Sequence, residues 1–92
     1  MKYEVLKEED KKLVLKLYTD THTYPQILKE YCLKNGAEFV GYYKEHPTSK
    51  FVLFMIEGEN PREIINKAKK EIIGDFKKLK EEIEKIKINK NN

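Results

Sequence analysis

The sequence predicts a two-layer α+β domain, in which a four-stranded antiparallel sheet and two helices follow the order β-β-α-β-β-α. Two observations predict this fold class, and the length of the chain sets the number of domains. Apolar and polar residues alternate in residues 2–7 and 13–18, and a period of two indicates strands. Residues 61–87 instead repeat apolar positions at helical spacing. The 92 residues suffice for one domain, which we assign to residues 1–88, followed by a polar tail at 89–92.

The first two strands are expected to form a hairpin. Leu13, Leu15 and Leu17 have a clear period of two, which places their side chains on one face of a sheet. The charged residues 8–11 lie between the two strands. A short polar segment of this kind suits a surface connection between antiparallel neighbours.

A helix is expected to follow the hairpin. Thr23 precedes Gln26 by three residues, with Pro25 in the first turn, and this arrangement is typical of a capping box. The pair Asn35 and Gly36 is a favourable helix end. The helix between these signals carries one broad apolar face, made of Tyr24, Ile27, Leu28, Tyr31 and Cys32.

Two further strands are predicted at residues 37–45 and 50–58, joined across residues 46–49. Within the second of them, residues 51–56 are apolar at every position. A strand without alternation is typically covered on both faces of its sheet. We therefore expect this strand to lie inside the sheet, with both of its faces covered.

The second helix begins with Asn60 as a capping residue, Pro61 at the first helical position and Glu63 at the third. Its main apolar stripe contains Ile65, Ala68, Ile72, Phe76, Leu79, Ile83 and Ile86. A helix over residues 61–87 is about 40 Å long, whereas strands of seven residues span roughly 23 Å. The helix must therefore extend beyond its own sheet, and the exposed end of the stripe indicates a binding partner. The alternative is a helix that bends over the core edge near Gly74, with a frayed end.

The residues that catalysis or metal binding would need are scarce. Cys32 is the single cysteine, and its helical, mostly apolar position predicts a core residue. His22 and His46 fall in predicted loops, and no metal-ligand spacing connects them to Cys32. The four glycines form no phosphate-binding pattern. We therefore expect no catalytic residue, no metal site and no cofactor.

The charge pattern is that of a solvated surface. The chain has 19 basic and 16 acidic residues, and Arg62 is its only arginine. Interleaved lysine and glutamate differ from the arginine-rich surfaces that read nucleic acids, so we expect no sequence-specific contact with DNA or RNA. The longest apolar run has six residues, too few to cross a membrane. With no signal-peptide pattern at residues 1–4, a cytoplasmic protein is expected.

The middle of the chain resembles the archaeal RNA polymerase subunit L family. Residues 20–30 (DTHTYPQILKE) resemble that family's D-H-T-L-x-N-x-L-R segment, and residues 36–42 (GAEFVGY) resemble the strand after it. Residues 45–47 and 50–53 resemble its His-Pro turn and the next strand, and residues 60–65 (NPREII) resemble the start of its long last helix. One departure is Pro25-Gln26, where the family often has Gly-Asn.

The resemblance implies a non-catalytic assembly subunit of a DNA-directed RNA polymerase. The L subunit of that family pairs through helices with the polymerase's D subunit, as the two bacterial α subunits pair, and the heterodimer is the platform for the large subunits. Combined with the helical faces above, the implied partner contacts are Ile27 and Tyr31 on the first helix and Ile72, Phe76, Leu79 and Ile83 on the second. Two other hypotheses remain open at this point: a small α/β nucleic-acid-binding protein with a basic helix, and a homodimeric adaptor.

Overall fold

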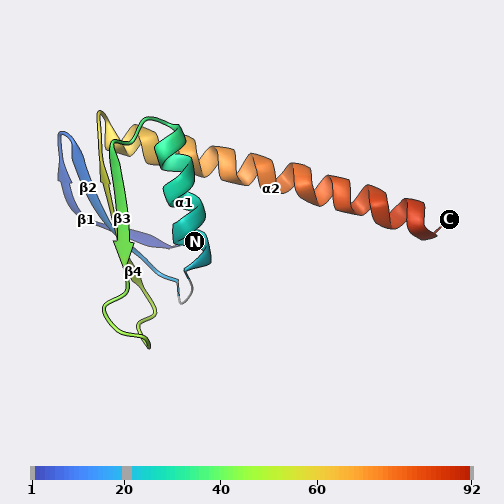
Figure 1. Ribbon diagram of the computed structural model, residues 1–92, viewed down its shortest axis with the longest axis horizontal. Helices are drawn as coiled ribbons and strands as arrows, with labels where there is room; N and C mark the ends of the chain where they lie inside the picture. Colours follow the sequence, from blue (N-terminus) through green and yellow to red (C-terminus); the bar gives the residue numbers. More distant parts are fainter. Residues whose placement is uncertain (1, 20–21, 92) are drawn as a thin grey trace.

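The computed structural model describes residues 2–19 and 22–91, with side chains as far as Ile86 (Figure 1). The strands form one antiparallel sheet in the order β1-β2-β4-β3, and both helices lie on the same face of it (Figure 1). The predicted fold class and element order are confirmed. The elements are β1 (Tyr3–Glu9), β2 (Lys12–Leu17), α1 (Thr23–Lys34), β3 (Phe39–Tyr43), β4 (Val52–Glu57) and α2 (Pro61–Asn91).

The core lies between the sheet and the helices, and the register of β2 and β4 explains its composition. Leu15 pairs with Phe54, and Leu13 pairs with Ile56. Directly paired residues share a face, so all four side chains point at the helices, and each is 1% exposed or less. Burial of side chains of this size contributes about 1.5–3 kcal/mol each. The alternation in the sequence therefore predicted the buried face of β2 correctly.

The prediction that β4 is covered on both faces is wrong for this chain. β4 does lie inside the sheet, between β2 and β3. Its Val52 and Phe54 are fully buried beneath the helices, whereas Leu53 and Met55 on the opposite face are only partly buried. β4 is apolar on both faces because it lies between two neighbouring strands, which partly bury the side chains on its outer face. Within the described residues, no helix covers the outer face of the sheet.

The predicted capping box at the start of α1 is also wrong. The N-cap is His22, and Thr23 is already helical, with no side-chain hydrogen bond to the cap. The Gln26 amide donates to the His22 carbonyl at 3.1 Å. The Gln26 side chain instead accepts a hydrogen bond from the Tyr42 hydroxyl at 2.8 Å. Its role is therefore to connect α1 to β3.

The end of α1 agrees with the sequence. The Asn35 amide donates to the carbonyls of Tyr31 and Cys32, each at 3.1 Å, and the Ala37 amide donates to Cys32 at 3.1 Å. Gly36 has a φ of 99°, a conformation that favours glycine after a helix. The chain can therefore reverse here and enter β3.

The long helix α2 extends well beyond the sheet, as predicted (Figure 1). The Ile64 amide donates to the Asn60 carbonyl at 3.1 Å, so the helix begins where the sequence placed it. Ile72 is the last buried residue along α2, and every described side chain after it is exposed. The helix passes through Gly74 without a break and continues to Asn91, so it includes residues 89–91, which the sequence assigned to a polar tail.

Replacing Gly74 with alanine should stabilise α2. A Cβ atom added at Gly74 meets no other atom within 4 Å, and alanine is favoured over glycine inside a helix by about 1 kcal/mol. The expected result for Gly74→Ala is higher helicity by circular dichroism and greater resistance to urea. Because this position lies on the side of α2 opposite the apolar stripe, the substitution should leave the surface of the stripe unchanged. A loss of helicity would instead indicate that α2 bends at Gly74 in solution.

Candidate protein–protein interface

The second half of α2 presents a stripe of exposed apolar side chains. Phe76 and Leu79 are each 52% exposed, Ile83 is 45% exposed and Ile86 is 62% exposed. Spacings of three and four residues place them on the same side of the helix as the buried Ile72. We call these four residues the distal stripe. The distal stripe lies on the same side of α2 as the residues that are buried against the rest of the domain. It lies farther along the helix, beyond the last buried residue, Ile72.

Of the six contact residues predicted from the sequence, three belong to the distal stripe and three do not. Ile72 is only 3% exposed and lies in the chain's own core, so we leave it out of the candidate interface. Ile27 and Tyr31 on α1 are partly buried against that core. Ile86 is the stripe residue that the predicted contact set omitted, although helical spacing in the sequence already placed it on the stripe.

Two hydrogen bonds hold α1 beside α2. The Tyr31 hydroxyl donates to the Asp75 carboxylate at 2.5 Å, and the Asn35 amide group donates to the Glu71 carboxylate at 2.5 Å. The bond to Asp75 raises the pKa of Tyr31, because it retains the hydroxyl proton. These bonds place the end of α1 alongside residues 71–75 of α2, so that the two helices form one continuous surface next to the start of the distal stripe. The two residues of each bond are 44 and 36 positions apart in the sequence, so no local sequence pattern predicts these bonds.

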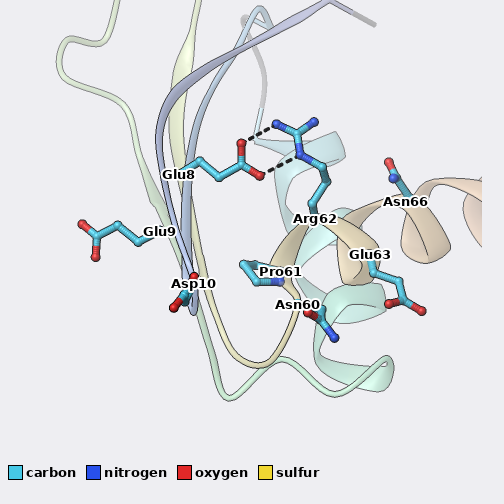
Figure 2. A pocket seen from close by; sticks show the side chains of 8 residues that line it. All are labelled: Glu8, Glu9, Asp10, Asn60, Pro61, Arg62, Glu63 and Asn66. Carbon is cyan, nitrogen blue, oxygen red and sulfur yellow. Dashed lines mark hydrogen bonds and ion pairs between the residues drawn. The ribbon is translucent and has the colours of Figure 1, made fainter.

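A further contact fixes the start of α2 against β1 (Figure 2). The Arg62 guanidinium donates two hydrogen bonds to the Glu8 carboxylate, each at 2.8 Å. This bidentate bond lowers the pKa of Glu8 and raises the pKa of Arg62. Because both side chains are about half exposed, the pair orients the helix more than it stabilises the fold.

An open hollow of about 580 Å³ surrounds this ion pair. In Figure 2, the Glu9 side chain points away from Arg62, and Glu63 lies on the other side of the helix start. The acidic groups therefore do not converge on one point. Among residues 2–19 and 22–86, no cluster of three or more His, Cys, Asp or Glu side chains is placed to hold a metal. The residues that line the hollow are Glu8, Glu9, Asp10, Asn60, Pro61, Arg62, Glu63 and Asn66.

The reactive residue types occupy structural positions. Cys32 is fully buried in the core, and this burial raises the pKa of its thiol to about 12, so the thiol is protonated at neutral pH. Its predicted role as a core residue is confirmed. His22 lies at the start of α1 with its ring centre 6.0 Å from that of Tyr42, and His46 is exposed between β3 and β4.

The outer face of the sheet carries a second apolar surface. A shallow groove of about 340 Å³ crosses β2, β4 and β3 there. It lies on the side of the sheet opposite the helices, so it is separate from the distal stripe. Its lining is Val14, Phe39, Gly41, Tyr42, Tyr43, Leu53, Phe54 and Met55.

Charged residues border the distal stripe on both sides. Lys80 lies about 80° around α2 from the centre of the stripe in one direction, and Glu82 lies about 80° away in the other. Both side chains are exposed, and neither takes part in an ion pair within the described part of the chain. No described helix is both long enough and apolar enough to cross a bilayer. A narrow apolar stripe with charged borders is typical of a helix that packs on another helix.

Comparisons with known proteins agree with this geometry. The structure is similar to the crystal structure of DNA-directed RNA polymerase subunit L from Thermoplasma acidophilum, with a TM-score of 0.77 and 18% sequence identity over 91% of this chain and 86% of that one. No curated protein sequence matches the chain. The family model described as RNA polymerase Rpb3/Rpb11 dimerisation domain matches residues 12–82. Because this match spans most of the 92 residues, the chain belongs to the RNA polymerase Rpb3/Rpb11 dimerisation-domain family.

Proposed function

We propose that this chain is a non-catalytic assembly subunit of a DNA-dependent RNA polymerase, and that it pairs through its helices with the polymerase's D subunit. The pair then serves as the platform on which the large polymerase subunits assemble. The observation that carries the proposal is the distal stripe of α2, which lies beyond the chain's own core and is half exposed. Membership of a dimerisation-domain family supports the same conclusion.

The size of the distal stripe indicates how much surface the partner must cover. Its four side chains are each about half exposed, so covering them completely contributes roughly 1 kcal/mol each. A total near 4 kcal/mol gives at best about millimolar affinity, because the cost of association must still be subtracted from it. Stable pairing therefore needs α1 as well, and Leu33, which is 43% exposed on α1, is available for contact. We infer that the partner contacts both helices.

The charge of α2 argues against nucleic-acid binding as the main function. Residues 61–91 contain ten basic and six acidic residues, so 10 minus 6 leaves a net charge of +4, and the acidic residues are distributed among the basic ones along the helix. Non-specific nucleic-acid binding depends on many unopposed lysine or arginine contacts with phosphates. A helix with alternating charges offers few of these contacts.

Mass measurement of the isolated chain, with and without the D subunit, tests the proposal. We expect a 1:1 complex by sedimentation velocity or native mass spectrometry, and a higher midpoint of thermal unfolding when the D subunit is added. A partner that binds only the folded chain stabilises it by about 4 kcal/mol when its concentration is a thousand times the dissociation constant.

The same preparations allow a direct comparison with the nucleic-acid hypothesis. Binding to DNA and RNA should be measured at about 0.15 M salt, where non-specific dissociation constants are roughly 10⁻⁴–10⁻⁶ M. An unchanged thermal midpoint at saturating D subunit, or nanomolar binding of either nucleic acid by the chain alone, contradicts the proposed function.

A further inference from the structure

We propose that the charges beside the distal stripe select a different protein chain as the partner and disfavour a second copy of this chain. The partner would be an amphipathic helix that runs antiparallel to α2, with acidic residues facing Lys80 and basic residues facing Glu82. This inference rests on the proposed function and adds to it the residues that determine partner choice.

The direction of the partner helix follows from the position of the domain on α2. Ile65, Ala68 and Ile72 lie on the same side of the helix as the distal stripe, and all three are buried against the sheet and α1. The chain's own domain therefore occupies that side of α2 as far as Ile72. A partner of the same fold, aligned parallel, would place its own domain in the same volume. Only the antiparallel direction carries the partner's domain past the free end of α2 (Figure 1).

The spacing of the distal stripe predicts which residues meet in such a pair. Steps of three, four and three residues from Phe76 to Ile86 match the a and d positions of a heptad repeat. In an antiparallel pair of two copies, Phe76 packs opposite Ile86, and Leu79 packs opposite Ile83. The two-fold axis then lies near residue 81.

This symmetry brings like charges together on both sides of the stripe. Lys80 lies next to Lys80 of the second copy on one side, and Glu82 lies next to Glu82 of the second copy on the other. Like charges across a helix pair disfavour association and are a common way of rejecting a wrong partner. On the side of Glu82, α2 also carries Glu71 and Asp75, which accept the hydrogen bonds from α1. Lys78 is the basic residue on that side, and it lies farther from the stripe than Glu82.

A charge-exchange experiment tests this inference with the chain alone. The variant Lys80→Glu/Glu82→Lys also places like charges together when it pairs with itself, but it places opposite charges together when it pairs with the unmodified chain. Equilibrium sedimentation of each chain and of a 1:1 mixture should show association in the mixture that is at least about tenfold tighter than in either chain alone. The difference should shrink as salt is raised from about 0.05 M to 1 M.

Two results of the mixing experiment would overturn the inference. One is self-association of the unmodified chain that is as tight as association in the mixture. The other is a mixture that shows no association at concentrations where the complex is expected. Circular dichroism of both chains tests whether α2 is intact in each sample.

A second arm uses the D subunit and separates this inference from the proposed function. Lys80→Glu should weaken binding of the D subunit about tenfold. The control Lys85→Glu makes the same charge change on the side of α2 away from the stripe, and it should change affinity by less than about twofold. Equal effects of the two substitutions reject the charge-selection inference but leave the proposed function standing. The proposed function itself fails if the unmodified chain does not bind the D subunit.

Discussion

Ile83→Asp is expected to abolish the proposed pairing with the D subunit and to leave the isolated chain folded. Ile83 lies in the middle of the distal stripe and is 45% exposed, with no part of its own core beyond Ile72 to cover it. In the free chain, the new carboxylate remains in water, and substitutions of this kind usually change the free energy of unfolding by less than about 0.5 kcal/mol. In a dry helix interface, the same unpaired carboxylate costs several kcal/mol of binding free energy. Co-purification with the D subunit and circular dichroism of the free chain measure the two effects.

The chain offers a matched control for this experiment on the same helix. Ile73 is 67% exposed but lies about 100° around α2 from the centre of the stripe. Ile73→Asp makes the identical chemical change and should preserve both the fold and the pairing. If Ile83→Asp unfolds the isolated chain, the end of α2 packs on its own core in solution. If both variants bind the D subunit equally, the interface lies elsewhere on the molecule.

Ile65→Asp is expected to unfold the domain. Ile65 is 5% exposed and belongs to the hydrophobic core between α2 and the sheet. An ionised carboxylate placed there loses its hydration, and it also replaces an apolar side chain that fills the core. The combined cost of several kcal/mol is comparable with the total stability of a domain this size, about 5–15 kcal/mol. We expect loss of the circular dichroism signal at 25 °C, or a urea midpoint far below that of the unmodified chain.

The neighbouring residue provides the control, and the single cysteine provides an independent measurement. Asn66 is exposed on α2, so Asn66→Asp introduces the same carboxylate one residue away and should leave the domain folded. The Cys32 thiol is fully buried, and burial raises its pKa to about 12, so a thiol reagent should label it only after unfolding. Rapid labelling of Ile65→Asp, with slow labelling of Asn66→Asp, is the expected pattern. Slow labelling of both variants would show that the core tolerates the charge.

The local signals in the sequence were most reliable where a single face decides burial. The period of two in Leu13, Leu15 and Leu17 predicted the buried face of β2, because successive side chains in a strand point to opposite sides. The signal failed at the start of α1, where Thr23 and Gln26 match a capping box but His22 is the cap. Gln26 is oriented toward Tyr42 by the packing of α1 over β3. The residues close to Gln26 in the sequence do not predict this packing.

The candidate interface was predictable only in part for the same reason. Helical spacing identified Phe76, Leu79 and Ile83 as members of one stripe, and all three are exposed. The same spacing included Ile72, which is buried. Periodicity reports the direction in which a side chain points, but it does not report where along the helix the covering sheet ends.

The sequence by itself determined the fold class, the order of the elements and the existence of one continuous apolar stripe on α2, because each of these depends on local periodicity and on residues that begin or end helices. The tertiary structure alone decided where that stripe leaves the core, since this depends on the length of the sheet beneath it. It also decided that the hydrogen bonds of Tyr31 and Asn35 to α2 hold α1 beside the stripe. These contacts join residues far apart in the chain, and only the packing of α1 on α2 brings their atoms within hydrogen-bonding distance.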